Sequence, residues 1–169
     1  NEYVPVYTNR FTQSLSLNPG RFVSANKEKG KFLNRFNNQF SLSANRRTSR
    51  TDLIRNMNPF LSEDSSLVSL QSQMRNLLSF NTKNQNIGFD YIFQKTANQN
   101  LMSYGTDYRA NQSHIFVSRF RPWNPLWINN KAERGSTEYE SGFFQTRNYQ
   151  LAFWRNDLSI IIESGDQTR

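Results

Sequence analysis

Apolar and polar side chains alternate through residues 84–123, and this alternation limits what the chain can fold into. Within 87–94, every second residue is apolar or aromatic, and the residues between them are mostly polar or glycine. A period of two residues is typical of a β-strand whose two faces meet different surroundings. The pattern returns in 102–108 and 115–120, so we predict three strands of about ten residues in an antiparallel meander. The expected turns are the Asn- and Gln-containing segments 97–100 and 110–112.

Similar alternation predicts strands before and after this stretch. The expected strands are 11–17, 32–45 and 158–162, and the segments 141–146 and 148–155 are expected to be two strands or one bent strand. Residues 18–20, with the sequence Asn-Pro-Gly, are a strong turn signal. Two prolines argue against a central strand in 122–130, and the charged segment 133–140 is predicted to be mostly loop. We expect a single all-β domain of about eight antiparallel strands, or a fragment of a larger barrel.

The segment 62–80 fits both a helix and a strand. Its leucine and methionine side chains have the spacing of one helix face, but they also alternate with polar residues as in a strand. Acidic residues after Ser62 also resemble the start of a helix in this segment. We favour a strand over 69–81, preceded by a short helix or an irregular crossing near 52–66.

The composition is polar, but it is not that of a disordered chain. Apolar residues make up 36% and aromatic residues 14% of the chain, and 22 of its 169 residues are Asn. Disordered chains are poor in aromatic residues, so we expect a folded domain whose buried side chains are largely aromatic. The sequence has no cysteine, which excludes disulfides and thiolate sites, and no apolar run long enough for a membrane helix. Its start at Asn1, without a signal segment, suggests a mature product or a piece of a longer protein.

The sequence has few groups suited to catalysis. The single histidine, His114, has no motif that places a carboxylate or a serine beside it, so we expect a surface or interfacial residue. Glu133, Glu138 and Glu140 are the obvious candidates for a glycosidase-like carboxylate pair. They share one polar stretch, however, and we favour a solvated loop. We therefore expect a non-enzymatic protein without a cofactor or metal site.

Basic residues suggest contacts with an anionic partner. The net charge is +8, from 21 Lys and Arg against 13 Asp and Glu. Arg119 and Arg121 alternate with aromatic residues, as on a base-stacking surface, but the glycine pattern of an RNA-recognition strand is missing. Arg46, Arg47 and Arg50 form a basic cluster at the end of a predicted strand. All five arginines are candidate contacts to an anionic ligand or to lipid headgroups, and nucleic acid is the less favoured partner.

Two architectures fit strands with one apolar face and one Asn-, Gln- and Ser-rich face. In a transmembrane barrel, the apolar face meets lipid and the polar face lines the interior. In a soluble β-sandwich or jelly roll, the apolar faces of two sheets pack against each other. We favour the barrel because polar residues dominate one face and aromatic residues often stand near strand ends, where the membrane interfaces lie. The candidate interfacial aromatics are Tyr91, Phe93, Tyr104, Tyr108, Trp123, Trp127 and Trp154.

Two segments resemble a known group of proteins. Residues 77–109, with FN followed by GFDY, and residues 143–169, with RNY, are similar to barrel segments of large outer-membrane proteins of the Bacteroidota. The resemblance implies a segment of a bacterial outer-membrane β-barrel with a structural, transport or secretion role. Its implied partners are the lipid bilayer and other chains of an outer-membrane assembly. The alternative is a secreted or virion-associated sandwich or jelly-roll module, which contacts nucleic acid, glycan or neighbouring subunits through basic loops.

Overall fold

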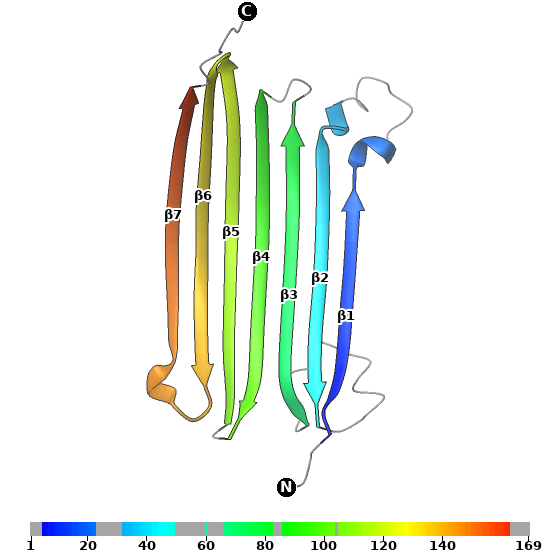
Figure 1. Ribbon diagram of the computed structural model, residues 1–169, viewed down its shortest axis with the longest axis vertical. Coiled ribbons are helices and arrows are strands. Elements are labelled where there is room, and N and C mark those ends of the chain that lie inside the picture. The colour runs from blue at the N-terminus through cyan, green and yellow to red at the C-terminus, as the bar shows by residue number, and fades with distance from the viewer. Residues whose placement is uncertain are drawn as a thin grey trace, which may run out of the picture.

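Seven strands form one antiparallel sheet in the order of the chain (Figure 1). The computed structural model describes residues 5–22, 32–49, 60, 66–82, 86–103 and 105–162. The strands are β1 (Tyr7–Leu17), β2 (Phe36–Thr48), β3 (Leu67–Asn81), β4 (Ile87–Met102), β5 (Gly105–Trp123), β6 (Leu126–Ser141) and β7 (Tyr149–Ile162). Two short 3-10 helices, η1 (Pro19–Phe22) and η2 (Gln145–Arg147), follow β1 and β6. The predicted all-β antiparallel fold is confirmed, with seven strands in the described residues where about eight were expected.

The connections join the strands at two opposite ends of the sheet (Figure 1). At one end, here called the Pro125 end, β5 turns into β6 through Asn124 and Pro125. At the other, the Gly105 end, β4 turns into β5. Gly105 has a φ of 133°, a conformation that glycine adopts without strain. β1 and β7 are the two edges of the sheet, because in the described residues each pairs with only one neighbour.

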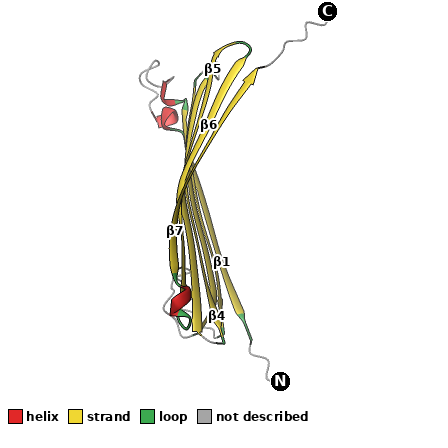
Figure 2. Ribbon diagram, turned by 90° about the vertical axis from the view of Figure 1, so that its left-hand side faces the viewer, coloured by secondary structure: helices red, strands yellow, loops and turns green. Residues whose placement is uncertain are grey.

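The described strands form a single layer. Figure 2 shows the sheet edge on as a thin, twisted ribbon of strands. Its buried apolar side chains, among the residues described, are Ala44, Leu67, Leu70, Ala110 and Ile115. Most of the larger apolar side chains are exposed or half-buried, and every residue of β7 is exposed. The strands therefore present two open faces instead of enclosing a core.

The pairing register gives these two faces different chemistry, because residues opposite each other on neighbouring strands point to the same side. Phe80 of β3 lies opposite both Phe36 of β2 and Phe89 of β4, so these three rings share one side. Ser79 and Asp90 lie opposite each other on the other side. We call the first side the apolar face and the second the polar face.

The meander over 84–123 has two long strands instead of three short ones. β4 continues through 97–100 and β5 continues through 110–112, so the segments predicted as turns lie in mid-strand. They pair with each other, Ala97 opposite Ala110. The prediction was wrong because these segments put Asn side chains on the polar face, and only alanine and glutamine side chains on the apolar face. Such a stretch keeps the strand period but lacks the apolar signal that reveals it.

β6 is a central strand, where an irregular segment and a loop were predicted. Pro125 lies in the turn before it, with a cis peptide bond after Asn124, so the proline does not interrupt the strand. The charged segment 133–140 lies inside β6 and pairs with β5 on one side and β7 on the other. The loop prediction was wrong because this half of β6 is polar on both faces, and two polar faces show no period.

The end of the chain also differs from expectation. Ser141 is the last residue of β6, and residues 142–146 form a turn and the start of η2 instead of a strand. The two strands predicted at 148–155 and 158–162 are one strand, β7. Asn156 and Asp157 stand between the apolar runs and resemble a turn, but they pair in register with β6.

The segment 67–80, which fitted both a helix and a strand, belongs to strand β3. This strand pairs with β2 and β4 along its length, from Leu67 to Asn81. The strands predicted at 11–17 and 32–45 correspond to parts of β1 and β2, although residues 32–35 precede the strand. The helix predicted near 52–66 lies outside the described residues, apart from positions 60 and 66.

Candidate functional surfaces

A band of mainly apolar side chains, interrupted by Asn38, Asn76, Ser118, Asn130 and Asn156, crosses the apolar face toward the Pro125 end. All seven strands contribute to this apolar band. Its members are Leu15, Leu17, Phe36, Phe40, Leu42, Met74, Leu78, Phe80, Ile87, Phe89, Tyr91, Phe93, Phe116, Phe120, Trp123, Leu126, Ile128, Ala132, Ala152, Trp154, Leu158, Ile160 and Ile162. On β4 the band covers 87–93 and on β7 it covers 152–162, which correspond to about 23 and about 36 Å along the strand at the usual rise per residue.

A row of phenylalanine rings runs through the band. The ring centres of Phe36 and Phe80 are 4.8 Å apart, those of Phe80 and Phe89 are 6.2 Å apart, and those of Phe89 and Phe116 are 6.0 Å apart. These contacts link β2, β3, β4 and β5 through cross-strand or diagonal neighbours, each of which contributes a fraction of a kcal/mol up to about 1 kcal/mol. The row also remains open on its outer side, since Phe89 is 40% exposed.

The apolar face becomes polar toward the Gly105 end. The residues beyond the band on this face include charged and amide side chains from four central strands. They are Arg46, Lys95, Gln112, Arg134, Ser136, Glu138 and Glu140. The same face is therefore mainly apolar over one part of the strand length, and over the rest it mixes charged and polar side chains with a few apolar ones such as Leu70 and Ala110.

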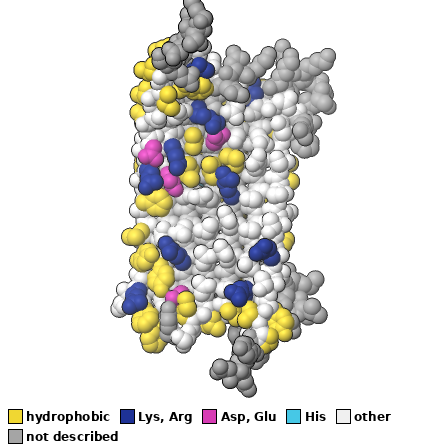
Figure 3. All heavy atoms as spheres, viewed as in Figure 1, with side chains coloured by type: hydrophobic (Ala, Val, Ile, Leu, Met, Phe, Trp, Pro, Cys, Tyr) yellow, Lys and Arg dark blue, Asp and Glu magenta, His cyan; other side chains and the backbone are white. Residues whose placement is uncertain are grey.

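The polar face is covered mainly by amide and hydroxyl side chains. One row across six strands shows this best: Thr12, Ser43, Gln73, Thr96, Asn111 and Thr137 are successive cross-strand partners. Figure 3 shows this face, which is mostly white with scattered Lys and Arg side chains. Apolar side chains gather near β7, where Leu151, Phe153 and Ile161 point to this side. A smaller apolar group on this face consists of Leu77, Ile92, Ile115 and Val117.

Basic side chains outnumber acidic ones on the polar face. Eight bases and four acids of the described strands point to it, an excess of four positive charges. The bases are Arg10, Arg47, Arg75, Arg109, Arg119, Arg121, Lys131 and Arg155, and the acids are Asp90, Asp107, Glu133 and Asp157.

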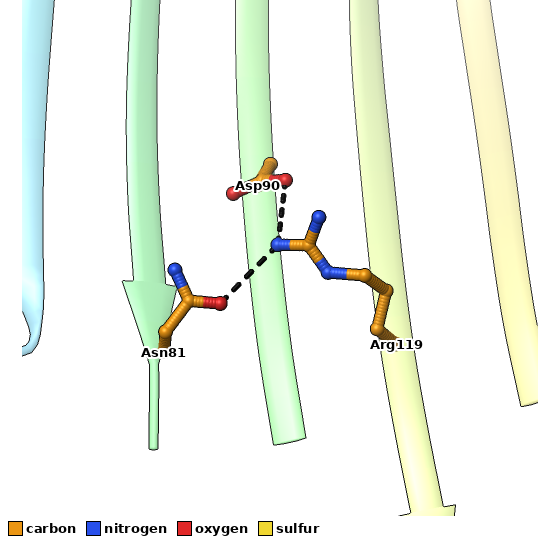
Figure 4. Close-up of polar contacts among 3 residues, drawn as sticks. All are labelled: Asn81, Asp90 and Arg119. Atoms are coloured by element: carbon orange, nitrogen blue, oxygen red, sulfur yellow. Dashed lines mark hydrogen bonds and ion pairs between the residues drawn. The ribbon is translucent and has the colours of Figure 1, made fainter. Parts of the chain in front are cut away.

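One polar contact joins three strands near the Pro125 end (Figure 4). Arg119 of β5 reaches across β4, where its Nη2 lies 2.9 Å from Asp90 Oδ2 and donates a hydrogen bond of 3.2 Å to Asn81 Oδ1 of β3. Gly88 lies beneath this arm. A Cβ atom there would stand 2.7 Å from Asn81 Oδ1 and 3.1 Å from Arg119 Nε. Because Gly88 has no side chain, the Arg119 side chain has room to cross β4 and reach Asn81.

A second glycine makes room for an aromatic ring. Gly135 of β6 lies opposite Phe153 of β7 on the polar face. A Cβ atom at Gly135 would collide with the Phe153 ring and would stand 2.8 Å from the backbone oxygen of Gln112. The ring of Phe153 therefore covers the backbone of β6, which a larger residue at Gly135 would prevent.

The arginines predicted to bind anions are not one cluster. Arg46 is buried on the apolar face, at 1% exposure, whereas Arg47 is exposed on the polar face. Arg50 lies outside the described residues. Arg119 and Arg121 both point to the polar face, and the Arg121 guanidinium lies 4.6 Å from the centre of the Trp127 ring.

The predicted interfacial aromatics lie in four different settings. Tyr91, Phe93 and Trp154 belong to the half of the apolar band nearer the Gly105 end, and Trp123 stands at its Pro125 limit. Tyr108 shares the apolar face but lies beyond the band. Trp127 points to the polar face, and Tyr104 lies outside the described residues.

His114 shares one side of the sheet with Glu138 and Glu140, and Glu133 is on the other side. His114 is on the apolar face at the margin of the band, where the Tyr91 hydroxyl lies 2.8 Å from its Nδ1. Glu133 points to the polar face, while Glu138 and Glu140 point to the opposite face beyond the band. Within the described ranges, no three His, Asp or Glu side chains gather as a metal site would require.

Comparisons with known proteins give no family for this chain. No protein-family description, no curated protein and no solved structure matches it. Among the described residues, no helix has the length and apolar character needed to cross a membrane.

The arginines of the polar face can be recognised as a group only from the strand register, not from the sequence alone. Arg47 and Arg119 were predicted from the sequence as anion contacts. Arg10, Arg75 and Arg109 were not predicted, because no other basic residue is near them in the sequence. Their common face follows only once the four successive strand pairings from β1 to β5 are known. The alternation within each strand was the available signal, and it needed correct strand limits to be used.

Proposed function

We propose that this chain forms part of the wall of a transmembrane β-barrel in a bacterial outer membrane. In this proposal lipid covers the apolar band, and the polar face borders a water-filled or plugged interior. The observation that carries it is the open apolar band on a single-layer sheet whose other face is polar. The role is non-enzymatic, and it is structural or concerned with the passage of a solute or protein.

Backbone pairing supports this proposal. A structure that crosses hydrocarbon has to satisfy its own backbone hydrogen bonds, and a sheet does so only for strands with a neighbour on each side. β2, β3, β4, β5 and β6 each have two neighbours. An exposed apolar band of this size is rare on a soluble monomer, where it marks an interaction surface or an aggregation hazard.

The height of the band also supports it. Bacterial barrels carry an outward apolar zone about 25 Å tall, crossed by tilted strands of about nine to eleven residues. The strands here have 11 to 19 residues, so they are long enough to cross it and extend beyond. Their charged ends, with Glu138 and Glu140 on the apolar face, fit the part that stands outside the bilayer.

Closure of such a barrel needs further strands. Because the meander has seven strands, β1 and β7 run in the same direction (Figure 1). Direct pairing of these two edges would create a parallel seam, whereas bacterial single-chain barrels are antiparallel with an even number of strands. We therefore expect an odd number of further strands between β7 and β1 in the complete wall.

Quenching by brominated lipid tests which face meets the membrane. Trp154 belongs to the apolar band and Trp127 points to the polar face, so single-tryptophan variants that keep one or the other form a matched pair. With the protein folded in vesicles of brominated phosphatidylcholine, we expect the Trp154 variant to lose most of its fluorescence and the Trp127 variant to keep most of it. The sandwich or jelly-roll alternative predicts a soluble, monomeric fold without detergent and no quenching of either tryptophan.

A further inference from the structure

On the polar face, most bases near the Pro125 end lie beside an acid, whereas most bases near the Gly105 end do not. Near the Pro125 end each acid has a base beside it. Asp90 pairs with Arg119 at 2.9 Å. Glu133 lies directly opposite Arg155, and Asp157 directly opposite Lys131. Cross-strand neighbours at this spacing compensate each other's charge.

The Gly105 end of the polar face has an excess of arginine. Arg10, Arg47 and Arg109 extend from β1, β2 and β5, and all three are exposed. The one carboxylate among them on this face is Asp107, so two positive charges are in excess. In the part of the chain that the structure describes, none of the three guanidinium groups forms an ion pair. We call this group the basic end, and Figure 3 shows blue side chains in the lower part of the face.

A cavity of about 480 Å³ opens between two of these arginines. Arg47 and Arg109 line it from β2 and β5, which are three strand spacings or about 14 Å apart in the backbone. Four carboxamides also line the cavity, from Asn45, Gln71, Asn98 and Asn100, as do Asp107 of β5 and Tyr139 of β6. The volume falls within the range of small-ligand sites.

The Asn45 side chain also indicates that the cavity binds a polar ligand. Its Oδ1 is buried and accepts no hydrogen bond within the described residues. A buried acceptor without a donor is unfavourable, so a guest that carries a hydroxyl or a water molecule would be stabilised there. Asp107 at the cavity can likewise accept a hydrogen bond from a hydroxyl, while it disfavours a guest with a dense cluster of negative charge.

We propose that the basic end binds the oxyanion group, carboxylate or phosphate, of a hydroxylated water-soluble solute. Guanidinium groups present paired N–H donors that match the oxygens of both anions, and the carboxamides between them suit hydroxyl groups. This proposal deepens the proposed function, on which it rests for its setting: in a barrel, the site lies on the interior wall. Unbalanced arginines there favour anions in the interior, as charged rings do in pores.

Titration of the full chain in detergent micelles tests the site with two probes, inorganic phosphate and tartrate, a hydroxylated dicarboxylate. We expect saturable binding of at least one probe, weakened about tenfold by Arg47→Gln or by Arg109→Gln, because each removes a charged hydrogen-bond donor. The control is Arg155→Gln, an arginine of the same face opposite Glu133, and it should change binding less than about twofold. The tighter probe identifies the anionic group.

Two results would overturn the site: saturable binding of neither probe, or binding that the Arg47→Gln/Arg109→Gln double variant leaves unchanged. Far-ultraviolet circular dichroism of each variant shows whether the sheet has formed. The assay does not depend on which face meets lipid. Lost anion binding with Trp154 still quenched by lipid refutes the site alone, and anion binding without lipid quenching refutes the barrel wall alone.

Discussion

Arginine in place of Phe89 is expected to lower the free energy of unfolding in lipid by about 2–4 kcal/mol, the usual effect of a cation on the lipid-facing side at the bilayer midplane. Phe89 lies in the middle of the apolar band, with Phe80 and Phe116 as ring neighbours. Its outer side is open, at 40% exposure, so in water an arginine would find solvent and disturb little. The large effect arises only if hydrocarbon replaces that solvent. Urea titration of the protein folded in vesicles measures it.

Two variants separate the charge from other changes in that experiment. Ser79→Arg adds the same side chain at a similar depth on the polar face, opposite Asp90, and should change stability by less than about 0.5 kcal/mol. Phe89→Leu removes the ring contacts without adding charge and should lower stability by less than about 1.5 kcal/mol. If Phe89→Arg is no more destabilising than Ser79→Arg, hydrocarbon does not cover this part of the band.

A methyl group at Gly135 is expected to destabilise the sheet by about 1–3 kcal/mol, as overpacking does in a filled site. The added Cβ would collide with the Phe153 ring and stand 2.8 Å from the Gln112 backbone oxygen. The ring can rotate away, but the strand carrying Gln112 has to shift. We expect Gly135→Ala to weaken the pairing of β7, so that amide hydrogen exchange accelerates, relative to the parent protein, more in β7 than in β3.

Gly142→Ala is the matched control for this substitution. A Cβ at Gly142 would have its nearest neighbour, the Thr106 backbone oxygen, at 3.4 Å, which is an ordinary contact. Its stability should stay within about 0.5 kcal/mol of the parent or rise slightly. In the Gly135→Ala/Phe153→Ala double variant the ring clash is gone, so the two changes should couple by about 1 kcal/mol. Strictly additive effects would show that Phe153 does not cover Gly135.

Two-residue periodicity predicted the fold class, but it did not predict the strand limits. Where one face was apolar, as at Phe36 to Leu42, the sequence led to the correct strand. Where the residues of both faces were mostly polar or small, as in the Gly105-end halves of β4, β5 and β6, the sequence showed no alternation of apolar and polar residues. Those halves are held in the sheet by pairing with neighbours, which a local pattern does not report.

The candidate surfaces were predictable to a different degree. The apolar side of each strand followed from alternation, because its apolar residues recur within one segment. The arginines of the polar face did not, since Arg10 and Arg109 are far apart in sequence and meet on one face only through four successive strand pairings. The roles of Gly88 and Gly135 were also not predictable from the sequence. Each glycine makes room for a side chain of the neighbouring strand, Arg119 and Phe153 respectively.

Spin-label accessibility along β4 tests the central claim most directly. The chain has no cysteine, so single cysteines introduced at 89, 91, 93, 92, 94 and 96 carry unique nitroxides. With the protein folded in vesicles, we predict that labels at 89, 91 and 93 collide mainly with oxygen, which concentrates in lipid. Labels at 92, 94 and 96 should collide mainly with a water-soluble nickel complex. Equal access of the nickel complex to both sets, or protection of 89, 91 and 93 from both reagents, would contradict a lipid-covered apolar band.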